Sequence, residues 1–381
     1  KRDGRDSLEK TVIREADYLI DKPSHGSPSS HKFSYIVTVS VKTQCYDGLY
    51  KPQGGPIMTK FTIMEDFPKS EIEFDQRFSN QSACFDYLFQ MKWPDGFTCS
   101  QCDHQAYWVS SKNIYICTRC EHQHSLTAGT IMDSSKKPII YWFKAMWWFT
   151  SRKTGVNAIN LQELLGFGSY NTAWYWLQKL RRCTIRKDRE KLSGNVEVDE
   201  FFIGGQKPGK RGRGSNGKTA VVAAVEKNDK KIGRIRLKVI SDCSAESLLS
   251  FIDENIEPGS DVFTDGWKGY QPLDQNKYHH HQVFQNKADD KDSVLPGVHL
   301  IASLVKRVIL STHQGRFDPN RLQNYLDEYV FRFNRRTSKY IGKKFMCIVQ
   351  QVISSTKITW RTIKANNTLT SAQKSSLGLS A

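Results

Sequence analysis

The sequence has no apolar run that approaches the ~20 residues needed to cross a membrane. Its 381 residues are also poor in acidic side chains, with 39 Asp and Glu against 56 Lys and Arg, which gives a net charge of +17. The first absence excludes a helical membrane-spanning protein and favours a soluble one. The second indicates a polyanionic partner, and nucleic acid explains it better than a membrane surface does.

The numbers and positions of cysteine and methionine are informative as well. The nine cysteines are odd in number, four of them are clustered, and no signal peptide is recognisable. These features favour a reducing, cytoplasmic compartment and metal ligation over a disulfide framework. The first of six methionines is Met58. Residues 1–57 are therefore expected to be a non-native or accessory extension, either upstream read-through or a short folded piece with period-2 alternation at residues 35–41.

Four of the cysteines form two Cys-x-x-Cys pairs, Cys99 with Cys102 and, after fourteen residues, Cys117 with Cys120. This short spacing lets both thiolates of each pair reach one tetrahedral ion, so the pattern predicts a structural Zn²⁺ site in a zinc ribbon. A helix predicted at residues 78–89 precedes the ribbon, and the two define a domain at residues 58–133. Three nearby histidines are superfluous to a four-thiolate site and are expected at the surface: His104, His122 and His124.

Residues 134–190 have the spacing of a helix-turn-helix DNA-binding domain. Pro138 begins an apolar helix, a second helix covers residues 160–165, and a third covers residues 173–182 after a glycine-containing turn. The third helix is expected to expose Lys179, Arg181 and Arg182 to DNA phosphates, as a recognition helix would. Three-helix cores without any DNA function share the same pattern.

After residue 190 the pattern becomes rich in strands. Strands are predicted at residues 196–203, 219–225, 232–240 and 261–264, with a helix at residues 244–256 before the last strand. This is the order of a ribonuclease-H-like α/β core, in which Asp199 on the first strand and Asp265 after the fourth meet side by side. The histidines at 279–281 are expected at the surface ahead of a strand. A late amphipathic helix has a basic face made by Arg332, Arg335 and Arg336.

In combination, these motifs resemble a zinc-ribbon group of bacterial insertion-sequence transposases that is related to Merlin elements. The resemblance covers roughly residues 58–345 and includes Val-Glu-Val-Asp199-Glu, Thr-Asp265-Gly-Trp, His299 with Lys306, and the Tyr-Leu-Asp-Glu run before Arg336. It implies a catalytic domain at residues 191–345 and a tail at residues 346–381. It also implies a nucleoid-associated recombinase, at least dimeric when it joins two ends, that binds double-stranded DNA at terminal inverted repeats, cuts 3′ ends and joins them to target DNA.

The implied chemistry uses two divalent ions, Mg²⁺ or Mn²⁺, held by carboxylates from separate elements. Asp199 and Asp265 are the expected carboxylates. By resemblance His299 is the third ligand, while Lys306 and Arg307 would contact DNA, and seven residues separate His299 from Lys306 on one helical face. Imidazole suits Mn²⁺ better than Mg²⁺, so this set departs from a fully acidic triad. Three aspartates in a polar loop remain alternatives for the third ligand: Asp289, Asp290 and Asp292.

Residues 212–219 match the phosphate-loop pattern, with Lys218 at its lysine position, which raises an ATPase as a runner-up. Such a loop should open a helix, yet the residues that follow are β-branched strand material. A basic loop that touches DNA phosphate through Lys210, Arg211 and Arg213 fits better, with a solvated loop as the plainer alternative. Because His299 is not acidic, a zinc-ribbon DNA-binding protein with an inactive transposase core is the other function considered.

Overall fold

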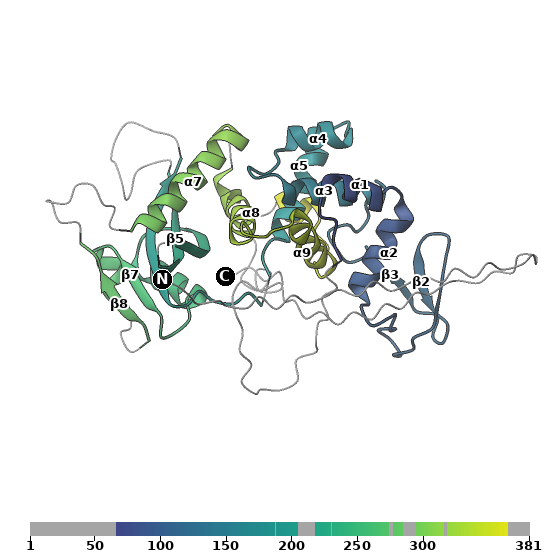
Figure 1. Cartoon of the computed structure of the whole chain (residues 1–381), viewed down its shortest axis with the longest axis horizontal. Coiled ribbons are helices and arrows are strands. Elements are labelled where there is room, and N and C mark those ends of the chain that lie inside the picture. Colours follow the sequence, from purple (N-terminus) through teal and green to yellow (C-terminus); the bar gives the residue numbers. More distant parts are fainter. Residues whose placement is uncertain are drawn as a thin grey trace, which may run out of the picture. The chain divides into compact units, whose positions relative to one another are not determined.

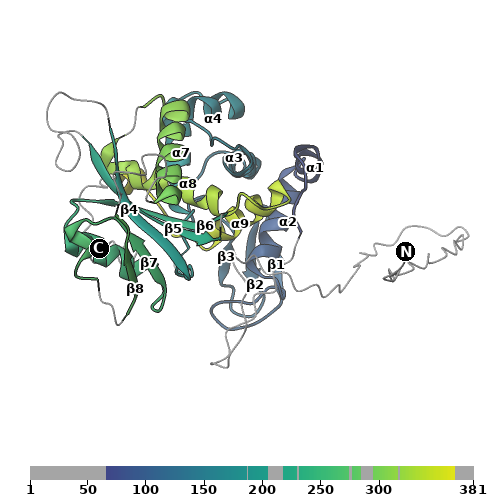
Figure 2. The same cartoon turned by 60° about the vertical axis from the view of Figure 1, so that its left-hand side comes forward.

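The computed structural model describes residues 66–186, 188–204, 218–229, 231–273, 277–284, 295–315 and 318–364, all within one compact unit of the chain. Several predictions concern residues outside these ranges: the extension at 1–57, the basic loop with Lys210, Arg211 and Arg213, the alternative ligands Asp289, Asp290 and Asp292, and the end of the tail. The described elements are drawn in Figures 1 and 2.

Two helices precede a small antiparallel sheet. In chain order these elements are α1 (Glu71–Arg77), α2 (Gln81–Lys92), β1 (Tyr107–Val109), β2 (Ile114–Cys117) and β3 (Gln123–Ser125). The helix predicted at 78–89 is present as α2, which begins one residue after Asn80 because the Asn80 side chain accepts the backbone N–H of Ala83 at 3.0 Å. The sheet carries both Cys-x-x-Cys pairs in the turns that flank its strands.

Three helices follow where the sequence predicts them, α3 (Ile139–Ser151), α4 (Ala158–Leu165) and α5 (Tyr170–Arg182). Gly166 ends α4 with φ 59°, a left-handed conformation that glycine adopts without steric cost, and the chain then turns into α5. The indole rings of Trp142 on α3 and Trp176 on α5 stack with centroids 3.7 Å apart. The three helices therefore share a packed apolar core.

The C-terminal helices return to this same core. They are α9 (Ile341–Ile353) and α10 (Trp360–Lys364). Phe345 and Ile348 of α9 are fully buried against α2 and α3, and α10 contacts α5. The boundary predicted between the catalytic domain and the tail at residue 345 therefore falls inside α9, a helix that belongs to the core of the N-terminal modules.

A five-stranded sheet forms the second core, in the order β6-β5-β4-β7-β8. Its strands are β4 (Asn195–Ile203), β5 (Thr219–Asn228), β6 (Lys231–Ile240), β7 (Asp261–Thr264) and β8 (His279–Gln282). The first three strands pair antiparallel, whereas β4, β7 and β8 run parallel. The histidine run predicted to precede a strand is itself β8, so that part of the prediction is wrong, whereas the predicted surface position is confirmed for His279 and His281. The α/β class and the first four strands are confirmed.

Helices cover both faces of this sheet. The remaining elements are α6 (Ala245–Asn255), η1 (Lys268–Tyr270), α7 (Pro296–His313), η2 (Pro319–Arg321) and α8 (Leu322–Asn334). α6 covers one face, while α7 and α8 cover the other (Figure 2). The residues directly after Lys218 form β5, not the helix that a phosphate-binding loop requires. The structure therefore argues against the ATPase reading.

Candidate functional site

The four cysteines of the two pairs come together in the small sheet. Their Sγ atoms all lie within 4.8 Å of one another, and three of the separations are 3.5, 3.7 and 3.3 Å. Four sulfurs each ~2.3 Å from a zinc ion would be about 3.8 Å apart, so the donor set fits tetrahedral zinc. Backbone N–H groups of Gln101 and Arg119 each point at a sulfur at 3.4 Å. The cluster suggests a structural zinc ion.

His124 lies against this cluster. It is only 8% exposed, and its Nε2 is 3.4 Å from Cys99 Sγ, which can accept the imidazole N–H. The surface position predicted for His124 is therefore wrong, whereas His122 is exposed and His104 half-buried. His124 is not part of the group of mutually close ligand atoms, and four thiolates already complete a tetrahedral site.

The two predicted acids lie on neighbouring strands of the five-stranded sheet, Asp199 in the middle of β4 and Asp265 directly after β7. Val198 on β4 pairs with Thr264 on β7, so Asp199 and Asp265 each come one residue beyond this pair on neighbouring parallel strands. Asp199 Oδ1 accepts the N–H of Glu200 at 2.8 Å, and Asp265 Oδ1 accepts the N–H of Trp267 at 3.0 Å. Asp199 and Asp265 therefore lie side by side, each one residue beyond the Val198–Thr264 pair.

Tyr270 lies beneath these carboxylates and is fully buried. Burial raises the pKa of its phenol well above the usual range, and the charges of Glu200, Asp199 and Asp265 raise it further. The phenol donates a hydrogen bond to Glu200 Oε2 at 3.1 Å. Glu200, Asp199 and Asp265 therefore all lie near one buried ring.

His299 approaches the acids from α7. Its Nε2 is 3.7 Å from Asp199 Oδ2, with the His299 side chain 56% and the Asp199 side chain 15% exposed. Lys306 and Arg307 are exposed further along α7, and Lys306 Nζ lies 5.7 Å from the centroid of the Phe201 ring. In the part of the chain that the structure describes, only the four cysteines form a group of three or more candidate ligands within 4.8 Å. Asp199 and His299 therefore lie close together, but Asp265 does not join them in a ligand group as compact as that of the four cysteines.

Comparison with known proteins shows what kind of chain carries this site. Residues 191–334, which include the acids, His299 and Lys306, match the ISXO2-like transposase domain, and residues 79–123 match the transposase zinc-ribbon domain. This chain carries the two domains of an insertion-sequence transposase. A protein of the transposable element ISH50 of Halobacterium salinarum, described as uncharacterized, is 24% identical over 70% of this chain and 95% of its own length.

The basic side chains of α5 are not arranged in this transposase as the sequence predicted. Lys179 is 5% exposed and its ammonium donates to the carbonyl oxygen of Ile131 at 2.6 Å, while burial lowers its pKa to about 8. Arg181 is 1% exposed and pairs with Glu328 of α8 at 2.7 Å. The predicted exposure of both is wrong, because Lys179 is covered by Ile131 and by Trp142 of α3, whereas Arg181 is covered by α8. Arg182 is half-buried.

The arginines of α8 are also largely occupied by the protein. Arg332 is 8% exposed and forms an ion pair with Glu328. Arg335 is half-buried and donates to the carbonyl oxygen of Phe331 at 3.2 Å. Arg336 is exposed, yet its guanidinium donates to the Gly233 carbonyl oxygen at 3.2 Å. Of the DNA contacts predicted among the described residues, Lys306 and Arg307 on α7 remain the most accessible.

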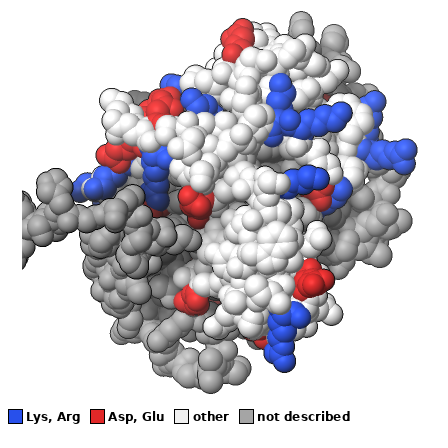
Figure 3. Space-filling view, turned by 90° about the vertical axis from the view of Figure 1, so that its right-hand side faces the viewer, with Lys and Arg blue, Asp and Glu red and all other residues white. Residues whose placement is uncertain are grey.

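On the face of the transposase seen in Figure 3, which is the right-hand side of Figure 1, basic residues are interspersed with acidic ones. Broad uncharged areas separate them. On this face the positive surplus is therefore not gathered into one continuous patch.

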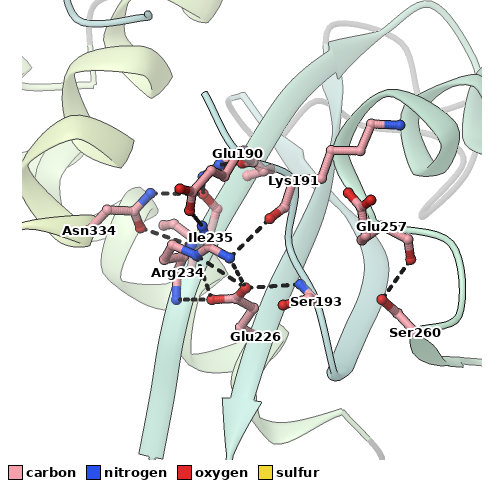
Figure 4. A network of polar contacts seen from close by, with 10 residues as sticks. Glu190, Lys191, Ser193, Glu226, Arg234, Ile235, Glu257, Ser260 and Asn334 are labelled. Carbon is pink, nitrogen blue, oxygen red and sulfur yellow. Dashed lines mark hydrogen bonds and ion pairs between the residues drawn. The ribbon is translucent and has the colours of Figure 1, made fainter. Parts of the chain in front are cut away.

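A polar network, drawn in Figure 4, joins the segment between α5 and β4 to β5 and β6. Glu226 on β5 is 6% exposed and accepts the N–H of Ser193 at 3.0 Å and the guanidinium of Arg234 at 2.6 Å. Arg234 also donates to the Lys191 carbonyl oxygen at 2.9 Å. Burial alone would raise the pKa of Glu226, but the hydrogen bonds from Arg234 lower it. Sequence reasoning did not find this network, since its members lie on separate elements.

None of the helices in the described residues is long and apolar enough to span a membrane.

Proposed function

We propose that this protein is a metal-dependent DNA transposase that binds the terminal inverted repeats of its element, cuts 3′ ends and joins them to target DNA. The observation that carries the proposal is the approach of His299 to Asp199 beside Asp265, inside a transposase domain. A ribonuclease-H-like core is part of the proposal, supported by the order of the sheet and by one acid in the middle of β4 and another directly after β7.

In this proposal Asp199, Asp265 and His299 hold the catalytic metal, and Lys306 holds a phosphate near the cut. Carboxylate oxygens and an imidazole nitrogen are a donor set that Mn²⁺ accepts, and Mg²⁺ less readily. When bound there, two divalent ions would activate a water or 3′-hydroxyl and stabilise the leaving oxygen. The role of the chain is to place the Asp199 carboxylate from β4, the Asp265 carboxylate after β7 and the His299 imidazole from α7 around one metal site.

End binding is assigned to the zinc ribbon and to α3, α4 and α5. Zinc ligation would supply the folding free energy of the small ribbon. On α5 the exposed part is the N-terminal turn, where Tyr170 is 49% exposed and Asn171 is exposed too, and such turns contact base edges in helix-turn-helix proteins. The basic loop with Lys210, Arg211 and Arg213 is proposed to contact phosphates. Holding two ends for joining requires at least two copies of the chain.

Cleavage of a labelled inverted-repeat duplex tests the function. Asp199→Ala and Asp265→Ala should each lower the cleavage rate by about 10³-fold or more while end binding stays within about twofold, because each removes a group that acts in the transition state. The matched control is Asp261→Ala, which removes an acid from the start of β7, where it pairs with His281, and which should cut like the parent.

If the parent bound ends but never cut them in Mg²⁺ or Mn²⁺, the alternative of a DNA-binding protein with an inactive core would replace this proposal. The specific observation that keeps this alternative is that Asp199, Asp265 and His299 do not form a compact ligand group among the described residues.

A further inference from the structure

Glu197 is a buried acid on the strand that carries Asp199. It lies two residues before Asp199 on β4, so its side chain points to the same face of the sheet. Only 6% of the residue is exposed. A carboxylate is costly at such a depth unless hydrogen bonds and charges compensate it. Its partners therefore indicate what it does.

One carboxylate oxygen of Glu197 contacts the start of α7. Oε2 accepts the backbone N–H of Val298 at 3.1 Å, in the first turn of the helix. The N-cap residue of α7, Leu295, offers no side-chain cap, and first-turn N–H groups have no partner within their own helix. Glu197 thus caps α7 from the neighbouring strand, where a negative charge also complements the helix dipole.

The other oxygen is occupied as well. Glu197 Oε1 lies 3.3 Å from Lys227 Nζ on β5. One oxygen accepts the Val298 N–H and the other pairs with Lys227, so both carboxylate oxygens of Glu197 contact groups of the protein itself. Its position next to Asp199 therefore does not make it a further ligand for the catalytic metal.

Gly297 leaves the room for this contact. A Cβ placed on Gly297 would lie 2.7 Å from Glu197 Oε2 and 3.2 Å from Val225 Cγ1. Any side chain there would push the first turn of α7 away from β4 and β5. His299 follows Val298 directly, so the same turn that Glu197 holds also sets where the imidazole sits relative to Asp199.

We infer that Glu197 is a positioning residue, which seats the N-terminus of α7 on β4 so that His299 reaches Asp199. The inference rests on the proposed function for its catalytic consequence, although the seating of α7 is a property of the folded chain without metal or DNA. Glu197 acts through the backbone of Val298 and touches neither the DNA nor the metal.

Three variants of the full chain test this role. Glu197→Ala removes the acceptor, and Glu197→Gln keeps an oxygen that can accept the Val298 N–H. Glu226→Gln is a matched control, because Glu226 is an equally buried acid of β5 that contacts Arg234 and Ser193 and not α7. The readouts are amide hydrogen exchange at Val298 in metal-free protein, Mn²⁺ binding by titration calorimetry, end binding and cleavage.

Glu197→Ala should speed exchange at Val298 by about tenfold or more and lower cleavage by about 10²-fold, as misplacement of a reacting group does, with end binding unchanged. It should also weaken Mn²⁺ binding. Glu197→Gln should restore exchange protection and most of the cleavage, and Glu226→Gln should leave exchange at Val298 as in the parent. Unchanged exchange at Val298 in Glu197→Ala, or faster exchange with normal Mn²⁺ binding, would overturn the inference.

A second, independent variant uses Gly297. In the parent, Gly297→Ala should speed exchange at Val298, since its Cβ collides with Glu197 Oε2. In the Glu197→Ala background the same substitution should have a smaller effect, so the two changes should not be additive. Additive effects would contradict the proposed contact. If the parent itself never cut DNA, the proposed function would fail, but exchange at Val298 and Mn²⁺ binding would still decide the role of Glu197.

Discussion

At the scale of single residues, the main feature is that several charged side chains are buried and pair with one another inside the protein. Glu328 is 3% exposed and holds both Arg181 and Arg332 between α5 and α8. Burial alone would raise the pKa of Glu328, but the two guanidinium groups lower it to about 2. Six consecutive residues of α5, from Trp176 to Arg181, are buried, so the C-terminal half of the helix is covered on all sides, which helical periodicity does not predict. For that reason the exposure of Lys179 and Arg181 was mispredicted.

Arg181→Ala should therefore act on stability. Arg181→Ala removes one of the two guanidinium groups that compensate the buried Glu328 carboxylate, while Arg332 stays, so we expect a loss of ~1.5–3 kcal/mol in the free energy of unfolding. Urea unfolding followed by circular dichroism measures it. Arg307→Ala, at an exposed arginine, is the control and should change stability by less than about 0.5 kcal/mol. A folded Arg181→Ala variant of parental stability that lost only end binding would show that Arg181 contacts DNA after all.

At the scale of elements, sequence patterns predict those features that depend on residues close together in the chain. Runs of apolar and β-branched residues predicted β4 and β5, period-2 alternation predicted β6, and the Cys-x-x-Cys spacing predicted the four-cysteine cluster. β8 was missed because three successive histidines give no strand signal, and its pairing with β7 depends on the sheet that is already there. The packing of α9 against α3 was missed for a related reason, since the two helices are far apart in the sequence.

The zinc ribbon is the element most dependent on its metal. Cys99→Ser should abolish zinc binding, unfold the ribbon and weaken end binding, while much of the transposase domain stays folded, because ligation supplies the folding free energy of so small a module. Zinc content by elemental analysis, together with near-ultraviolet circular dichroism, measures both effects. Cys243→Ser, at a half-buried cysteine outside the cluster, should keep its zinc. Parent protein purified without zinc, yet with an intact ribbon, would contradict this dependence.

At the scale of the whole described chain, modules that the sequence predicts as separate domains contact one another. α5 of the helical module is tied to α8 by Glu328, the segment after α5 is tied to β5 by Glu226, and α9 returns to the N-terminal core. The order of ribbon, helices and α/β core was predictable because each has its own periodicity and motif. The contacts between them were not, since they depend on pairs of residues that no local pattern links, 33 positions apart for Ser193 with Glu226 and 147 for Arg181 with Glu328.

The central claim is that Asp199, Asp265 and His299 form one metal site, and exchanging His299 tests it most directly. In a cleavage assay on a labelled inverted-repeat duplex, the account predicts that His299→Ala loses cleavage in both Mg²⁺ and Mn²⁺. His299→Glu should retain or raise cleavage in Mg²⁺, because it supplies the oxygen ligand that this ion prefers. If His299→Ala cut like the parent while a substitution of Asp289, Asp290 or Asp292 abolished cleavage, the third ligand would lie in that loop and the claim would be wrong.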